Sequence, residues 1–167
     1  MLITDISKQV SKNGTKINIS YLKDRDGIVD KYTLTSVELP RPEMLDIWSA
    51  INIAFQRVNP AYNDEETWLE FDFHKCNIKY GEDRQGKTVI KAYKLTGTML
   101  WDYMGFCNIV TDWLAPQQNM ELTAAVDKLT VEASLYAKGK RAQMQLFDDK
   151  TIQDAEVIDC RRGVMKE

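Results

Sequence analysis

The sequence is poor in the residues that build metal centres, disulfides and nucleophilic sites. Among its 167 residues are three cysteines, Cys76, Cys107 and Cys160, and one histidine, His74. No two cysteines form a C-x-x-C pair, so the spacing encodes neither a disulfide framework nor a zinc ribbon. A single histidine also leaves few ways to assemble a Ser-His or Cys-His pair. We therefore predict no catalytic residue, no metal site and no cofactor, and interpret the protein as non-enzymatic.

Long apolar runs and an excess of positive charge are also missing. No segment approaches the roughly 18 to 20 apolar residues that span a bilayer, and the first residues do not resemble a secretion signal. We therefore expect a cytoplasmic protein without a membrane partner. Lys and Arg total 22 against 25 Asp and Glu, which gives a net charge of −3. Because this balance provides no global attraction for phosphates, any contact with nucleic acid has to be local.

The residues that are present have the composition of one folded domain, with 44% hydrophobic and 28% charged side chains. Apolar and β-branched patterns predict six strands, at residues 2–10, 16–23, 28–35, 67–80, 88–95 and 105–111. Within 67–80 the alternation changes phase, which predicts a bulge or turn near His74 and Lys75.

Two segments have the apolar period of an amphipathic helix. The first begins at Pro42 and ends before Asn59, with an apolar stripe of Met44, Leu45, Trp48, Ile51, Phe55 and Val58. The second is capped by Asn119 and stopped by Gly139, and its stripe consists of Leu122, Val126, Leu129, Ala133 and Tyr136.

The order of strands, helix, strands, helix predicts an α+β fold. We expect a single domain over residues 1–140, with a mostly antiparallel sheet and two amphipathic helices on one face. No internal repeat is visible in the sequence. Residues 141–167 have the acidic, mixed composition of a C-terminal tail.

Residues 81–88 match the phosphate-binding pattern G-x-x-x-x-G-K-[ST]. In a nucleotide-binding protein this pattern opens a helix whose N-terminus faces the phosphates, yet residues 88–95 continue as a strand. We therefore interpret the match as a polar hairpin loop between two strands.

Aromatic and basic residues alternate along two predicted hairpins. On an open sheet face, rings stack on bases while lysines follow the phosphates, as in proteins that bind single strands. This pattern makes candidate nucleic-acid-binding residues of Tyr21, Lys23, Tyr32, Lys91, Tyr93 and Lys94. Ordinary strand composition explains the same alternation.

The tail carries the sequence Gln143-Met-Gln-Leu-Phe147, which resembles the Q-x-x-L-F peptide that binds bacterial sliding clamps. In such peptides the glutamine, here Gln143, hydrogen-bonds at the rim of a pocket. The Leu and Phe side chains, here Leu146 and Phe147, fill an apolar cleft. The resemblance implies a bacterial protein partner, the sliding clamp. The alternative is that Leu146 and Phe147 pack back on their own domain.

The segment G-K-R-A-Q at residues 139–143, followed by Leu146 and Phe147, also resembles the ending of small uncharacterised bacteriophage and prophage early proteins from replication and recombination gene clusters. More loosely, the similarity extends to residues 40–44. It implies a phage protein of the host cytosol, close to replication or single-strand annealing factors, with no activity to carry over.

Three hypotheses follow from these observations. The leading one is a phage or prophage accessory protein of DNA replication or recombination that docks on the clamp through its C-terminal motif. The second is a single-stranded nucleic-acid-binding module, with single-stranded DNA as partner. The third is an inhibitor of a host defence or replication enzyme. The sequence leaves the oligomeric state open.

Overall fold

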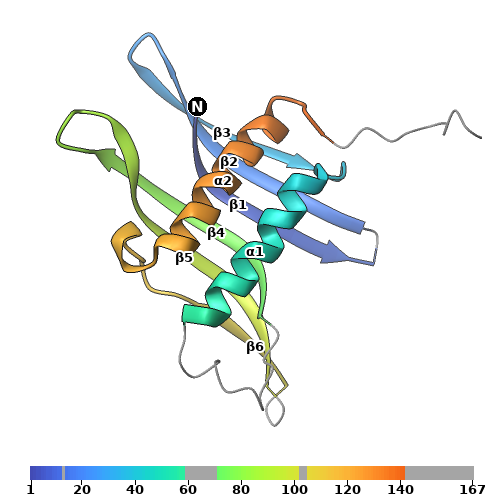
Figure 1. Ribbon diagram of the computed structural model, residues 1–167. Coiled ribbons are helices and arrows are strands. Elements are labelled where there is room, and N and C mark those ends of the chain that lie inside the picture. Colours follow the sequence, from blue (N-terminus) through green and yellow to red (C-terminus); the bar gives the residue numbers. More distant parts are fainter. Residues whose placement is uncertain (13, 59–70, 102–104, 142–167) are drawn as a thin grey trace, which may run out of the picture.

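The computed structural model describes residues 1–12, 14–58, 71–101 and 105–141, and these form a single α+β domain. Its sheet has six antiparallel strands in the order β3-β2-β1-β4-β5-β6. The strands are β1 (Leu2–Ser11), β2 (Gly14–Arg25), β3 (Ile28–Ser36), β4 (Phe71–Glu82), β5 (Thr88–Trp101) and β6 (Gly105–Val110). Two helices, α1 (Pro42–Val58) and α2 (Met120–Ala137), cover one face (Figure 1). No described element covers the opposite face, which we call the open face.

The connectivity repeats, although the sequence shows no repeat. Three strands and a helix are followed by three strands and a helix, and the first strands of the two halves, β1 and β4, pair at the centre of the sheet. Each helix packs on the first strand of the other half, because α1 packs on β4 and α2 packs on β1. The topology is therefore that of two halves related by an approximate two-fold axis between β1 and β4.

Ion pairs at both ends show that the two helices run antiparallel. Arg41, just before α1, makes two hydrogen bonds of 2.7 Å to the carboxylate of Glu132 near the end of α2. Arg57, in the last turn of α1, lies 2.9 Å from Glu121 in the first turn of α2. The Arg41 pair is the better shielded of the two, because the Glu132 side chain is only 13% exposed.

The core lies between the helices and the covered face of the sheet. It is built from alternate strand residues such as Ile6, Ile19 and Phe73, together with the apolar stripes of both helices. Helix α1 also satisfies backbone groups of the sheet, because the Trp48 indole donates to the Phe73 carbonyl at 2.6 Å and the Asn52 side chain accepts from the Phe73 N–H at 2.9 Å.

The structure confirms the predicted fold class and the positions of both helices. The predicted irregularity in β4 is also confirmed, since the register with β5 shifts between Phe73 and Lys75. The helix stripes are confirmed except for Leu45, which is 47% exposed, and for Val58, whose side chain lies outside the described residues. Leu45 faces solvent, whereas Ala54, which was not part of the predicted stripe, is buried.

Candidate functional site

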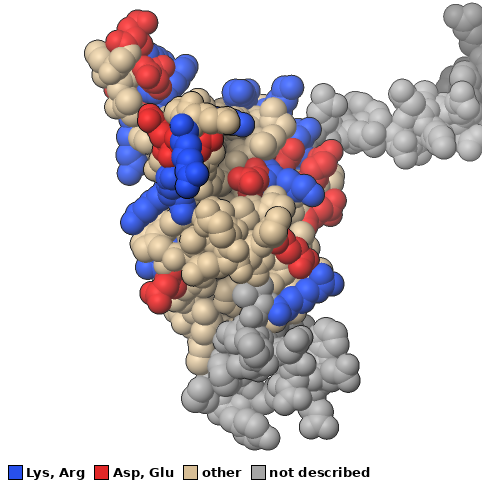
Figure 2. All heavy atoms as spheres, turned by 60° about the vertical axis from the view of Figure 1, so that its left-hand side comes forward, with Lys and Arg blue, Asp and Glu red and all other residues tan. Residues whose placement is uncertain are grey.

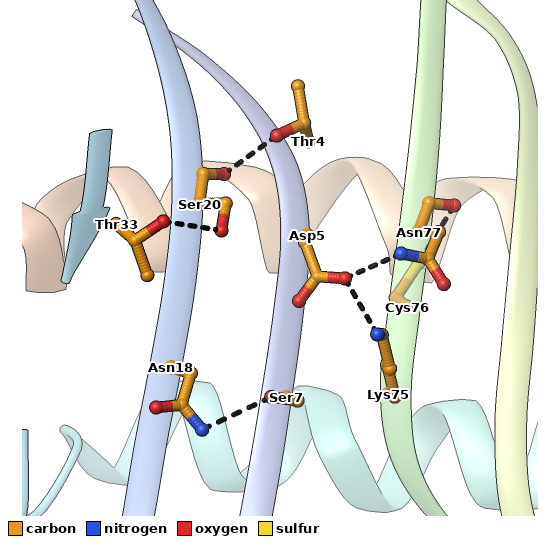
Figure 3. Close-up of polar contacts among 9 residues, drawn as sticks. All are labelled: Thr4, Asp5, Ser7, Asn18, Ser20, Thr33, Lys75, Cys76 and Asn77. Atoms are coloured by element: carbon orange, nitrogen blue, oxygen red, sulfur yellow. Dashed lines mark hydrogen bonds and ion pairs between the residues drawn. The ribbon is translucent and has the colours of Figure 1, made fainter. Parts of the chain in front are cut away.

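The open face of the sheet is lined by small polar side chains that bond to one another. On its β1–β3 side, Asn18 accepts from Thr35 at 2.8 Å and donates to Ser7 at 3.4 Å. Ser20 and Thr33 form a further pair at 3.1 Å. Figure 3 looks onto this face with both helices behind the strands. These mutual hydrogen bonds make this half of the open face a self-satisfied polar surface.

One carboxylate, Asp5 of β1, lies at the centre of the open face. It accepts from the Asn77 side chain and forms an ion pair of 3.1 Å with Lys75, both on β4 (Figure 3). The Asp5 side chain is 22% exposed and that of Lys75 is 41% exposed. The ion pair with Asp5 therefore neutralises the positive charge of Lys75.

Beyond Lys75, lysines continue along the open face on alternate strands. Lys94 of β5 pairs in register with Asn77, and Lys79 of β4 pairs with Ala92. Their faces follow from their neighbours, because Cys76, Ile78, Tyr93 and Leu95 are buried on the helix side.

Lys91 joins this series through a bulge in β5. The register shifts there, since Ala92 pairs with Lys79 while Ile90 pairs with Tyr80. The stem of Lys91 lies over Gly81, so close that a Cβ on Gly81 would come within 2.5 Å of it. We call Lys75, Lys94, Lys79 and Lys91, in this order along the sheet, the lysine row.

Trp113 borders the lysine row beyond β6. The ammonium of Lys79 sits 3.8 Å from the centroid of the Trp113 ring, and the residue remains 40% exposed. Its position is fixed by backbone hydrogen bonds of 3.0 and 2.8 Å between Tyr93 and Leu114. The open face thus presents a partly exposed indole with a lysine ammonium over one face of its ring. On the side of the molecule drawn in Figure 2, Lys and Arg lie among Asp and Glu.

The six candidate nucleic-acid-binding residues do not share one face. Tyr93 was predicted to be a stacking residue, and this is wrong: it is fully buried under α2, with its hydroxyl 3.1 Å from the Thr123 hydroxyl. Tyr21 and Tyr32 stack with ring centroids 5.4 Å apart, in register with core positions on the helix side, and Lys23 follows Tyr21 on the same side. Of the six, the open face contains Lys91 and Lys94.

The phosphate-like pattern at 81–88 forms the predicted hairpin loop between β4 and β5. The Asp83 carboxylate accepts from the backbone N–H groups of Gln85 at 2.8 Å and Lys87 at 2.9 Å. These bonds hold the pKa of Asp83 below its usual value. The N–H groups that would face a phosphate thus bind a carboxylate of the loop itself, and Thr88 begins a strand.

A groove runs between α2 and the start of β5. A cavity of 390 Å³ in it is lined by residues that include Tyr80, Lys87, Thr123 and Asp127. Burial raises the pKa of the Tyr80 hydroxyl to about 12 and also raises the pKa of Asp127. The groove therefore contains both a carboxyl group, Asp127, and an amine, Lys87, so it does not favour a ligand of one charge.

Two residues of types that bind metals, Cys76 and His74, lie on the central strand β4. Cys76 is fully buried, and burial raises the pKa of its thiol. His74 occupies the bulge of β4 at intermediate exposure. Within the described ranges, no three His, Cys, Asp or Glu side chains gather as metal ligands. No helix there is long and apolar enough to cross a bilayer.

The clamp-like residues Gln143, Leu146 and Phe147 lie outside the described residues, as does Cys160. The last described residue, Arg141, forms an ion pair with Glu38, whose backbone carbonyl also accepts from the Tyr136 hydroxyl. The end of α2 is thereby fastened to the segment between β3 and α1. Comparisons with protein-family models, curated proteins and solved structures found no match to this chain.

Proposed function

We propose that the protein is a non-enzymatic accessory factor of bacteriophage or prophage DNA replication or recombination. It docks on a replication protein, the bacterial sliding clamp, through Gln143, Leu146 and Phe147. This proposal places the protein in the cytoplasm of the bacterial host. The observation that carries it is the position of the Q-x-x-L-F motif, which begins two residues after Arg141, a residue anchored to Glu38.

The end of α2 supports this role because it directs the chain away from the helix at a defined point. Gly139 has a φ of +87°, its N–H donates to Tyr136, and the Lys140 N–H donates to Leu135 at 3.0 Å. These two bonds are those of a Schellman motif, which ends a helix and satisfies its last carbonyls. A docking peptide attached just beyond such an anchor is tied closely to the domain that it recruits.

Calorimetry with a purified bacterial sliding clamp tests the proposal. We expect binding by the full chain and a loss of at least about 30-fold in affinity for the Leu146→Ala, Phe147→Ala double variant, since truncated hot-spot residues cost about 2 kcal/mol or more. The matched control is Met144→Ala with Gln145→Ala, which changes the two unspecified positions of the motif and should bind as the wild type.

Thermal unfolding of the same variants separates docking from packing. If Leu146 and Phe147 belong to the core of their own domain, the double variant unfolds at a clearly lower temperature than the control variant. That result, or the absence of clamp binding by the folded wild type, would overturn the proposal.

A further inference from the structure

We propose that the open face of the sheet binds the backbone of a single-stranded nucleic acid along the lysine row, with Trp113 as a stacking surface. This inference does not depend on the C-terminal motif. It differs from the sequence-based hypothesis in its residues, because Tyr21, Tyr32 and Tyr93 lie on the helix side and Lys75, Lys79 and Trp113 take part instead.

The first argument is the spacing of the lysines. Three successive register positions on the open face, from Lys75 to Lys79, each contribute one lysine, alternately from β4 and β5. The bulged residue Lys91, whose stem lies over Gly81, supplies the fourth. Neighbouring positions on one face of a strand are about 6.7 Å apart, so four positions extend over about 20 Å. A strand of duplex DNA completes a turn in about 34 Å and would curve away from a straight row of this length. An extended single strand can follow it.

The second argument is charge. Asp5 pairs with Lys75, and the Asp83 carboxylate near Lys91 is engaged by two backbone N–H groups of its loop. Within the described part of the chain, Lys91 and Lys94 have no ion-pair partner, and Lys79 contacts the Trp113 ring. Three ammonium groups are thus available for phosphates on a protein whose net charge is −3.

The third argument is the aromatic surface beside the row. Base stacking on an exposed ring tolerates any sequence, and lysines that contact phosphates carry no sequence information. Trp113 is held at the edge of the row by the backbone bonds of Leu114, so stacking needs little ordering of the protein. The site is therefore expected to bind single strands with little sequence preference.

The test measures binding of the full chain to a fluorescein-labelled thymidine oligomer of about 12 nucleotides by anisotropy. Release of counterions from three phosphates predicts a slope of about −2 for log K against log salt, so binding should weaken about 20-fold between about 50 and about 200 mM salt. The triple variant Lys79→Gln, Lys91→Gln, Lys94→Gln should lose most of this affinity and have a slope near zero.

The matched control is Lys12→Gln, Lys128→Gln, Lys140→Gln, which changes the net charge equally at exposed positions outside the row. It should retain the slope of the wild type. Trp113→Phe should remove the quenching of tryptophan emission that the oligomer causes in the wild type. Circular dichroism establishes that each variant is folded.

Three outcomes would overturn the proposal. They are no oligomer binding by the folded wild type at low salt, equal losses in the row variant and the control variant, and tighter binding to a duplex of the same length than to the single strand. Phosphatidylserine vesicles serve as a further arm, and binding to vesicles without binding to oligomers would assign the row to a membrane surface instead.

Discussion

At the scale of single residues, Asp83 shapes the loop that resembles a phosphate-binding motif. Its carboxylate accepts from the N–H groups of Gln85 and Lys87, and these bonds lower its pKa. A lowered pKa means that the bonds are fully present above the ordinary aspartate value of about 3.9 and are lost as the pH falls through the lower value of the folded protein.

We therefore expect the amide shifts of Gln85 and Lys87, followed by NMR against pH, to titrate together at a pH below the ordinary aspartate value. In Asp83→Ala both amides should exchange faster with solvent than in the wild type. Asp83→Asn keeps an acceptor oxygen, so its amides should exchange more slowly than those of Asp83→Ala. Titration at or above the ordinary value would contradict this account of the loop.

Gly97 of β5 is required by close packing rather than by its backbone angles. A Cβ at this position would lie 2.3 Å from the Phe71 ring and 2.8 Å from the Asp72 carbonyl oxygen. The Phe71 ring is itself stacked on Phe55 of α1, with centroids 4.0 Å apart, so it has little room to withdraw.

We predict that Gly97→Ala lowers the free energy of unfolding by about 1–3 kcal/mol through overpacking. Urea denaturation measures this change. Adding Phe71→Leu should remove part of the clash, so the double variant should lose less stability than the sum of the two single variants. Additive losses would show that the ring is not the obstacle.

At the scale of elements, α1 supplies hydrogen-bond partners to β4 where its pairing with β1 has ended. The register between β1 and β4 covers only Asp5–Ser7 against Lys75–Asn77, and Phe73 lies just outside it. The Phe73 N–H instead donates to the Asn52 side chain, and the Phe73 carbonyl accepts from the Trp48 indole, both on α1. A buried backbone N–H that loses its acceptor costs about 1–3 kcal/mol.

Asn52→Ala should therefore lower the free energy of unfolding by about 1–3 kcal/mol, measured by urea denaturation. Ser49→Ala, at an exposed position of the same helix, is the control and should change it by less than about 0.5 kcal/mol. If the two variants unfold alike, the Asn52 side chain does not support the bulge.

The sequence predicts the positions of helices and strands better than it predicts which face of the sheet a residue occupies. The helix stripes and strand alternations are local patterns, and they place both helices and the six strands near their observed positions. The fifth strand is the exception in length, because β5 continues to Trp101, six residues beyond its predicted end. Tyr93 is in phase with Leu95, so the alternation alone assigns it to the covered face, and treating it as a stacking residue was wrong.

The lysine row depends on information that no single segment contains. Lys91 reaches the open face because a bulge shifts the register of β5, and a shift of one residue reverses the face of a strand. The contact between Lys79 and Trp113 joins residues far apart in the chain. The apolar and basic residues of one segment indicate neither the bulge nor the register between strands. The lysine row could therefore not be predicted from the sequence.

At the scale of the whole molecule, the two halves are interlocked rather than adjacent. Each helix packs on the first strand of the other half, and the helix ion pairs join Arg41 to Glu132 and Arg57 to Glu121. The Tyr136 hydroxyl further ties α2 to the backbone at Glu38. A half separated from its partner would expose the face of its three strands and the apolar stripe of its helix to water.

We therefore predict that the domain unfolds as one cooperative unit and that neither half folds alone. Denaturation followed by circular dichroism and by tryptophan fluorescence should give coincident transitions. Fragments 1–64 and 65–167, cut between α1 and β4, should each be unfolded and should regain the native circular dichroism spectrum when mixed. The reason is that each fragment lacks the helix that covers its own first strand. A folded isolated fragment, or two separate transitions in the intact chain, would show instead that the halves are independent units placed side by side.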